Sequence, residues 1–143
     1  MLNGVIYNIA PWSVVYAVDA KTGKELWRSN PDVNQEVWRS RSCCGVVKRD
    51  IALYEGKVIA PIIDGRLRAI DAATGKVLWT TRVSPDTQPY TITMAPRVIK
   101  GGRIIIGVAG GEYGIRGFFS AFDVNTGKEL WKRWTVPGDP SKP

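Results

Sequence analysis

The chain of 143 residues contains no histidine, only two cysteines and no long apolar run. The missing histidine excludes Ser-His-Asp and Cys-His catalysis, histidine metal ligands and c-type haem attachment within this chain. A membrane-spanning helix needs about 20 apolar residues, so no segment is expected to cross a membrane. Any chemistry therefore depends on carboxylates, lysine, tyrosine, the backbone or a bound cofactor.

The charge is positive but dispersed. The net charge is +7, and 44% of the residues are hydrophobic, which is typical of a folded protein. No block of five lysines and arginines occurs, so we expect the basic residues to be scattered over exposed strand faces, with no nucleic-acid partner. Residues 1–5 lack the charged and apolar regions of a signal peptide. That pattern indicates a cytoplasmic protein or a piece cut from a longer one.

An internal repeat dominates the sequence. VYAVDAKTGKELWR at 15–28, LRAIDAATGKVLWT at 67–80 and FSAFDVNTGKELWK at 119–132 align without gaps, and seven of the fourteen columns are identical. The aspartates Asp19, Asp71 and Asp123 recur at a spacing of 52 residues, as do three tryptophans, Trp27, Trp79 and Trp131. A fixed period of this length is typical of repeat architectures.

Each unit is predicted to form a strand, a turn and a strand. Residues 15–18 alternate with a period of two, Asp19 opens a turn, and Gly23 supplies a left-handed residue at its end. Two further hairpin signals, at 55–57 and at 64–65, add strands to the second unit, so a unit is expected to hold about four antiparallel strands. No segment shows the 3.6-residue period of a helix.

Tandem four-stranded antiparallel units are the blades of a β-propeller, and the repeated tryptophan is expected to pack between blades. The chain holds about 2.75 units, whereas propellers close with about 4 to 8 blades. We therefore predict an all-β fold with an incomplete blade at 1–28 and blades at 51–80 and 96–132. A loop at 133–143 would lead to a missing downstream portion. Open strand edges would make such a piece prone to aggregation.

The two cysteines, Cys43 and Cys44, are adjacent and lie between the first two units. A disulfide ordinarily joins Cα atoms about 4.4–6.8 Å apart, and neighbouring Cα atoms are only about 3.8 Å apart. A bond between them would be strained, apolar and rigid, and strain of this kind points to function. Two reduced cysteines that act as small core residues are the alternative, which the spacing alone favours.

Residues 109–117 replace the tight hairpin that the other units carry before the Ala-x-Asp strand. Gly110 and Gly111 allow the backbone to approach a ligand closely, and Glu112 suits a hard cation such as Ca²⁺. A flexible surface loop with a solvated glutamate is the alternative. The segment 89–96 is polar and aromatic just before a strand, and alone it indicates only a connection between blades.

Together these segments resemble the pyrroloquinoline quinone (PQQ)-dependent alcohol dehydrogenases, the methanol and ethanol dehydrogenase group. The resemblance covers essentially the whole chain and includes PWSVVYA at 11–17, CCGVVKR at 43–49, PYTITMAP at 89–96, GGEYGIRG at 110–117 and VPGDPSKP at 136–143. The cysteine pair and the Gly-x-Glu loop are specific to this family. The tryptophan repeat also occurs in other propellers.

The resemblance implies an eight-bladed propeller with the quinone near its axis. Cys43 and Cys44 match a vicinal disulfide that covers one face of the cofactor, and Val47 lies alongside. Arg49 and Thr93 match side chains that hydrogen-bond its carboxylates and carbonyls.

Further matches concern the metal. Gly110 and Gly111 match backbone close to the quinone, and Glu112 matches a ligand of Ca²⁺ or, in some branches, of a lanthanide. The metal would act as a Lewis acid on the quinone carbonyl while a base takes the alcohol proton.

The resemblance also implies partners and a compartment. The substrate would be a small primary alcohol, the electron acceptor a cytochrome c-type protein, the covering partner the remaining blades of the same propeller, and the compartment the periplasm. The competing hypothesis is a non-catalytic propeller scaffold, as in outer-membrane assembly lipoproteins. That hypothesis explains the tryptophan repeat but neither the cysteine pair nor the Gly-Gly-Glu loop.

The chain departs from the family pattern at two positions and lacks several parts. Lys48 stands where an asparagine is common, and Met94, where a small residue is common, is expected to crowd the cofactor site. The catalytic aspartate, a second metal ligand and the tryptophan below the quinone belong to later blades. We therefore expect no catalytic residue here and no alcohol oxidation by this chain alone.

Overall fold

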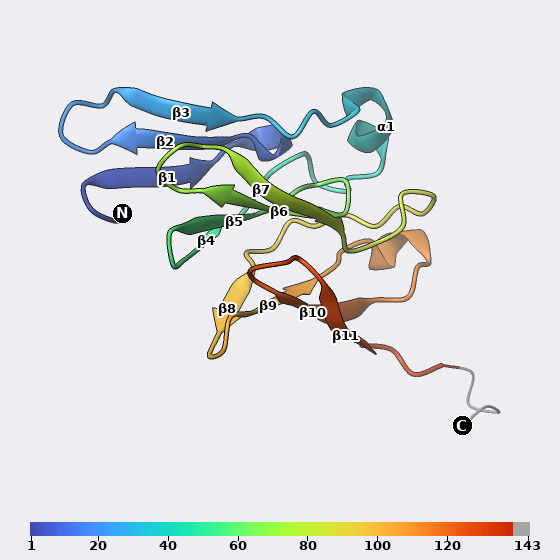
Figure 1. Cartoon of the computed structure of the whole chain (residues 1–143). Coiled ribbons are helices and arrows are strands. Elements are labelled where there is room, and N and C mark those ends of the chain that lie inside the picture. The colour runs from blue at the N-terminus through green and yellow to red at the C-terminus, as the bar shows by residue number, and fades with distance from the viewer. Residues whose placement is uncertain (139–143) are drawn as a thin grey trace.

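A computed structural model of the chain describes residues 1–138. Three antiparallel sheets follow one another along the chain and are stacked in sequence order (Figure 1). The first sheet has the order β1-β2-β3, with β1 at Val5–Ile9, β2 at Val15–Asp19 and β3 at Glu25–Ser29.

The second and third sheets have four strands each, in meander order. The second contains β4 (Ala52–Tyr54), β5 (Lys57–Pro61), β6 (Arg66–Asp71) and β7 (Val77–Arg82). The third contains β8 (Arg97–Ile99), β9 (Arg103–Gly107), β10 (Phe118–Asp123) and β11 (Glu129–Trp134). The prediction of an all-β partial propeller is confirmed.

Two details differ from the sequence-based expectation. Strand β11 continues to Trp134, so the segment 133–143 begins with two strand residues rather than with a loop, and its part at 139–143 lies outside the described residues. A helix, α1 (Gln35–Ser40), joins the first two sheets although no helical period was seen. Its first turn is capped by Asn34, whose Oδ1 accepts a hydrogen bond from the Val37 amide at 3.2 Å. Six residues are too few to establish a period.

The repeat produces the same local geometry three times. Three alanines, Ala17, Ala69 and Ala121, are fully buried and pair with the repeated tryptophans across the strands. A register shift follows each alanine, because one strand carries an extra residue there. In each turn the threonine hydroxyl donates to the aspartate Oδ1 at 2.7–2.8 Å. These bonds lower the pKa of all three aspartates.

Apolar side chains fill the spaces between the sheets. One core cluster contains Ile9, Val15, Val58, Ala60, Ile70 and Ala72, from the first two sheets. The other contains Ile59, Leu67, Ala69, Val83, Tyr90, Ile92, Ile104, Ile106, Phe118, Phe122 and Val124. Burial of these faces supplies the main driving force for stacking the blades.

Two of the repeated tryptophans, Trp27 and Trp79, form hydrogen bonds from their own sheet to the next one. The indole N–H of Trp27 donates to the Ala72 carbonyl at 3.0 Å, and that of Trp79 donates to the Val124 carbonyl at 3.1 Å. The expectation that these rings pack between blades is confirmed for both junctions.

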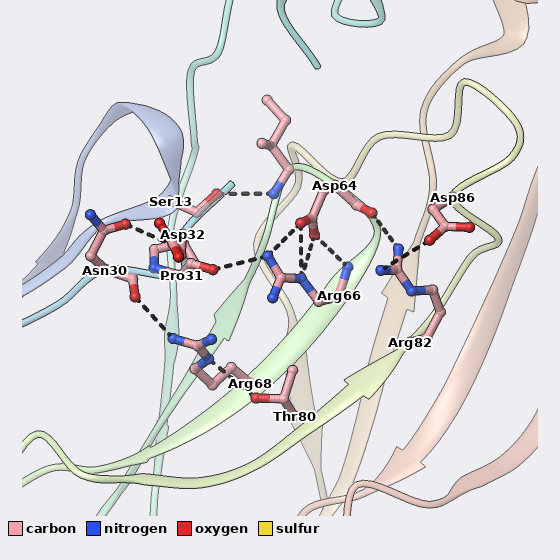
Figure 2. A network of polar contacts seen from close by, with 11 residues as sticks. Ser13, Asn30, Pro31, Asp32, Asp64, Arg66, Arg68, Thr80, Arg82 and Asp86 are labelled. Atoms are coloured by element: carbon pink, nitrogen blue, oxygen red, sulfur yellow. Dashed lines mark hydrogen bonds and ion pairs between the residues drawn. The ribbon is translucent and has the colours of Figure 1, made fainter. Parts of the chain in front are cut away.

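A polar network provides a second set of contacts between the first two sheets (Figure 2). Arg66 forms an ion pair with the buried Asp64 and donates to the Pro31 carbonyl at 2.9 Å. The hydroxyl oxygen of Ser13 accepts a bond from the Ile63 amide at 2.9 Å. Because these partners lie 35 and 50 residues apart in the sequence, the network fixes how the first two blades sit against each other.

No helix among residues 1–138 is long and apolar enough to cross a membrane.

Candidate cofactor site

Three segments that are far apart in the sequence surround one small cavity of about 70 Å³. They are the stretch that follows α1, the connection before β8, and the connection between β9 and β10. The lining residues are Ser42, Cys43, Cys44, Gly45, Val47, Arg49, Thr91, Thr93, Ala109 and Glu112. A cofactor pocket usually measures about 300–1,000 Å³, so the residues of this chain form only one side of such a pocket.

The adjacent cysteines are joined by a disulfide, with Cα atoms 3.8 Å apart. The alternative of two reduced core cysteines is therefore wrong, and both residues are exposed rather than packed in the core. The next residue, Gly45, has a φ of +90°, which a residue with a side chain rarely adopts. The disulfide thus forms a rigid, apolar wall on one side of the cavity.

Arg49 and Thr93 form the polar part of the wall. The guanidinium Nη1 donates to the Thr93 hydroxyl at 2.8 Å, and the Arg49 amide donates to the Thr93 carbonyl at 3.2 Å. The bond to Thr93 holds the Arg49 guanidinium at the cavity. Among the described residues, no carboxylate forms an ion pair or a hydrogen bond with this guanidinium. An exposed guanidinium of this kind suits an anionic ligand.

The connection around Thr91 ties the two other segments together. Thr91 and Ala109 exchange backbone hydrogen bonds at 3.0 and 2.8 Å. The hydroxyl of the neighbouring Tyr90 is buried and donates to the Arg116 carbonyl at 2.8 Å. The segment 89–96, which the sequence indicated only as a connection, therefore forms the middle of the site.

Glu112 lies at the margin of the cavity in a short 3-10 helix, η2 (Gly111–Tyr113). The hydroxyl of Tyr113 donates to the Ser40 carbonyl at 3.4 Å, so this loop contacts the end of α1. Gly110 has a φ of +129°, and an added Cβ would lie 2.4 Å from Ile115 and 2.7 Å from the Pro89 carbonyl. Only glycine fits at position 110, and its lack of a side chain lets the backbone lie close to Ile115 and Pro89.

Lys48 follows Val47 and precedes Arg49, which both line the cavity, but does not line it itself. Its ammonium donates to the Ile92 carbonyl, which itself lies between Thr91 and Thr93. Burial lowers the pKa of Lys48 to about 7, although the charge of Asp64 acts in the opposite direction. The bond from Lys48 to Ile92 thus connects the stretch 47–49 to the stretch 91–93.

Met94 is not among the residues that line the cavity, and its crowding of a bound cofactor stays a prediction. Its sulfur accepts a hydrogen bond from the Gly107 amide at 3.1 Å. This contact turns the side chain toward β9.

The structure brings together six of the eight residues that the sequence indicated. Gly110 and Gly111 precede Glu112 without lining the cavity, so their closeness to a cofactor stays a prediction. The sequence reasoning missed four lining residues, Ser42, Gly45, Thr91 and Ala109. Each lies within three residues of a predicted one, and Thr91 and Ala109 belong to the segments 89–96 and 109–117, which stood out in the sequence.

These residues fit an anionic quinone and one edge of a metal site. The disulfide offers an apolar surface, and Arg49 offers a cation at the same cavity. Glu112 is the only carboxylate of the lining. No group of three or more metal-ligating side chains occurs within residues 1–138, so a metal held by Glu112 needs ligands from outside this part.

The family model for the β-propeller domain of PQQ-dependent glucose, ethanol and alcohol dehydrogenases matches residues 1–143. The chain belongs to this family. A quinohemoprotein alcohol dehydrogenase, ADH IIB of Pseudomonas putida, is 52% identical over 99% of this chain and 20% of its own length. The chain thus spans about a fifth of the relatives that it matches.

Solved structures of this PQQ family agree with the fold. The quinohemoprotein alcohol dehydrogenase of Comamonas testosteroni superposes with a TM-score of 0.93 at 46% identity, over 100% of this chain and 21% of that one. A europium-containing methanol dehydrogenase superposes with a TM-score of 0.87 at 35% identity, over 94% of this chain and 23% of that one. The three sheets are thus similar to one part of larger PQQ dehydrogenase propellers.

Proposed function

We propose that this chain supplies one side of the cofactor site in a PQQ-dependent dehydrogenase that oxidises a primary alcohol to an aldehyde. The observation that carries the proposal is the single cavity at which the disulfide, Arg49 and Glu112 meet. The apolar wall and the cation come from residues 43–49, and the carboxylate comes from a segment more than 60 residues later, yet all three line one cavity.

In this proposal the lining residues have separate tasks. Cys43, Cys44 and Val47 exclude water from one face of the planar cofactor. Arg49 binds a carboxylate or carbonyl oxygen, and Thr93 holds the guanidinium in place through the bond at 2.8 Å. Charge-assisted bonds of this type are roughly twice as strong as neutral ones, so Arg49 would give most of the affinity on this side.

Glu112 would supply one oxygen ligand to a Ca²⁺ or lanthanide ion beside the quinone. Oxygen ligands are what such hard cations require. The europium-containing methanol dehydrogenase supports a lanthanide as one of the two choices. Because Gly110 and Gly111 have no side chains, they would leave room beside Glu112 for the cofactor to approach the metal.

When bound, PQQ takes up the hydride that the alcohol loses, and the metal withdraws electrons from the quinone. The catalytic base would come from blades outside this chain. We further propose a small primary alcohol as substrate, a cytochrome c-type electron acceptor, the remaining blades of the same propeller as the covering partner, and a periplasmic location. The name of the Pseudomonas putida relative, a quinohemoprotein alcohol dehydrogenase, supports an alcohol as the substrate.

Titration of the chain with PQQ, followed by quenching of tryptophan fluorescence, tests the proposal. We expect Arg49→Gln to weaken binding by about tenfold or more, because a hydrogen bond to a charged group contributes about 1.5–3 kcal/mol. Arg97→Gln is the matched control, since Arg97 is exposed on β8 and does not line the cavity. Equal weakening by both variants, or by neither, would contradict the proposal.

The metal role of Glu112 has its own test. Ca²⁺ or Eu³⁺ is expected to strengthen PQQ binding by the unaltered chain and to have no effect on Glu112→Gln. Glu36→Gln, an exposed carboxylate on α1, is the control. A scaffold without a cofactor, the competing hypothesis, predicts that neither PQQ nor the metal binds.

A further inference from the structure

Lys48 contacts both stretches that carry the polar residues of the cavity. It directly precedes Arg49, and its ammonium donates to the carbonyl of Ile92, which directly precedes Thr93. Arg49 and Thr93 both line the cavity and are joined by the bond of 2.8 Å from guanidinium to hydroxyl. Along each stretch, the ammonium is therefore one residue away from a group that would bind an anion.

The ammonium of Lys48 has no negative partner of its own. Within residues 1–138 no ion pair includes it. The negative charge that acts on it belongs to Asp64, in the turn between β5 and β6, and this carboxylate already accepts a bond from the Arg66 guanidinium at 2.8 Å. Buried charges in proteins are ordinarily paired, because an ion loses much of its hydration on leaving water. Burial accordingly lowers the pKa of Lys48 to about 7, in spite of the charge on Asp64.

The other groups around Lys48 do not supply the missing negative charge. The segment 89–96 and the 3-10 helix η1 (Pro11–Ser13), which form backbone hydrogen bonds with residues next to Lys48, contain no charged residue. In the sequence Lys48 stands next to the cation of Arg49 and two residues before Asp50, whose carboxylate is exposed. An anion in the cavity would therefore provide the negative charge that this lysine lacks.

We propose that Lys48 is a positioning residue for the cofactor: it takes up a proton when an anion binds at Arg49 and Thr93, and its ammonium then supplies a second positive charge to that anion. The proton comes from solvent and converts the neutral amine of Lys48 to the ammonium. The bond from this ammonium to Ile92 also keeps Thr93 in place beside Arg49. The inference rests on the proposed function, with PQQ as the anion.

This coupling sets the direction of the pH dependence. Before an anion binds, Lys48 loses its charge as the pH rises through about 7. A bound anion stabilises the ammonium and so raises the pKa of Lys48 in the complex. PQQ should therefore bind most tightly below pH 7, and its affinity should fall as the pH rises from there to the raised value, because binding then requires a proton.

The side chains that ordinarily change charge between about pH 6 and 9 are otherwise missing from this chain. It contains no histidine, and its two cysteines are joined in a disulfide. Ionisation of PQQ itself is the same for every variant of the chain. Differences between variants in this pH range therefore report on the altered residue.

Two measurements with PQQ between pH 6 and 9 test the inference. Quenching of tryptophan fluorescence gives Kd, and calorimetry in buffers of different ionisation enthalpy gives the number of protons taken up. For the unaltered chain we expect Kd to be about tenfold lower at pH 6 than at pH 9, and we expect uptake of about half a proton at pH 7.5.

Two substitutions at one position separate charge from structure. Lys48→Met has no charge at any pH, so its Kd should match that of the unaltered chain at pH 9 and be about tenfold higher at pH 6. Lys48→Arg is charged at every pH, so its Kd should stay low from pH 6 to 9. Both should lose the proton uptake at pH 7.5. Lys100→Met, in the exposed turn between β8 and β9, is the control and should keep both the pH profile and the uptake.

Three outcomes would overturn this inference alone. The first is PQQ binding by the unaltered chain without proton uptake at pH 7.5, a result that needs no variant. The second is the same pH profile for Lys48→Met and the unaltered chain. The third is weaker binding by Lys48→Met at every pH with unchanged proton uptake, which would indicate a merely structural role. A chain that binds no PQQ at any pH would contradict the proposed function as well.

Discussion

At the scale of single residues, Lys48 is the group whose charge depends most on the fold. Its ordinary pKa of 10.5 falls to about 7 in the folded chain because burial penalises the ammonium. Between these two values the unfolded chain binds more protons than the folded one. The free energy of unfolding therefore rises as the pH increases from about 7 toward 10, and at lower pH the full cost of the buried charge is present.

Lys48→Met tests this reading, since methionine fills similar space without a charge. At pH 6 we expect the variant to be more stable than the unaltered chain by about 1 to 3 kcal/mol, after loss of the bond to Ile92 is subtracted. Its unfolding free energy should also change less between pH 7 and 10. Urea denaturation at a series of pH values measures both effects.

Lys100→Met is the control for that series, because Lys100 is exposed in the turn between β8 and β9. Its stability profile should run parallel to that of the unaltered chain. A parallel profile for Lys48→Met would show instead that Lys48 stays charged at low cost.

At the scale of elements, the turn glycines separate two physical effects. Gly23 and Gly127 have nearly equal φ values of +72° and +70°, yet only Gly127 has a tryptophan ring above it. Gly23→Ala carries the strain of the left-handed backbone alone. Gly127→Ala carries that strain and also the clash with Trp79.

We predict a loss of about 1 to 2 kcal/mol for Gly23→Ala and about 2 to 5 kcal/mol for Gly127→Ala. Urea denaturation of dilute, monomeric chain measures the two losses. Equal losses would mean that the Trp79 ring moves aside freely and does not hold the blades together.

Much at this scale could be predicted from the sequence because it is encoded locally. The strand-turn-strand units depend on neighbouring residues, such as Asp19 with Thr22 and Gly23, and these recur at a fixed spacing. Helix α1 could not be predicted, since one and a half turns carry no period and its single signal was the cap at Asn34.

The cavity was only partly predictable for a different reason. Cys43, Arg49 and Glu112 stood out by their chemistry, whereas Thr91 and Ala109 lie in segments that stood out but carry neither a charge nor a sulfur atom of their own. Their place in the wall depends on a pairing between the segments before β8 and after β9, and no local pattern encodes that pairing. Likewise, the contact of Met94 with Gly107 exists only in three dimensions.

At the scale of the whole molecule, the described residues form only one side of a cofactor pocket. The lining contributes one carboxylate, and no cluster of metal ligands forms within the described residues. We therefore predict that the 143-residue chain, mixed with PQQ, Ca²⁺ and a dye acceptor, does not oxidise ethanol. Dye reduction above that of PQQ and Ca²⁺ alone would contradict this prediction.

The most direct test of the account is a titration of the isotope-labelled chain with PQQ, observed through its backbone amide signals. We expect shifts concentrated in residues 42–49, 91–93 and 109–112, with the turns at 71–76 and 123–128 unchanged. That result would show that three distant segments form one cofactor surface. Shifts spread evenly over the sheets, or no shifts at concentrations that saturate the fluorescence change, would contradict it.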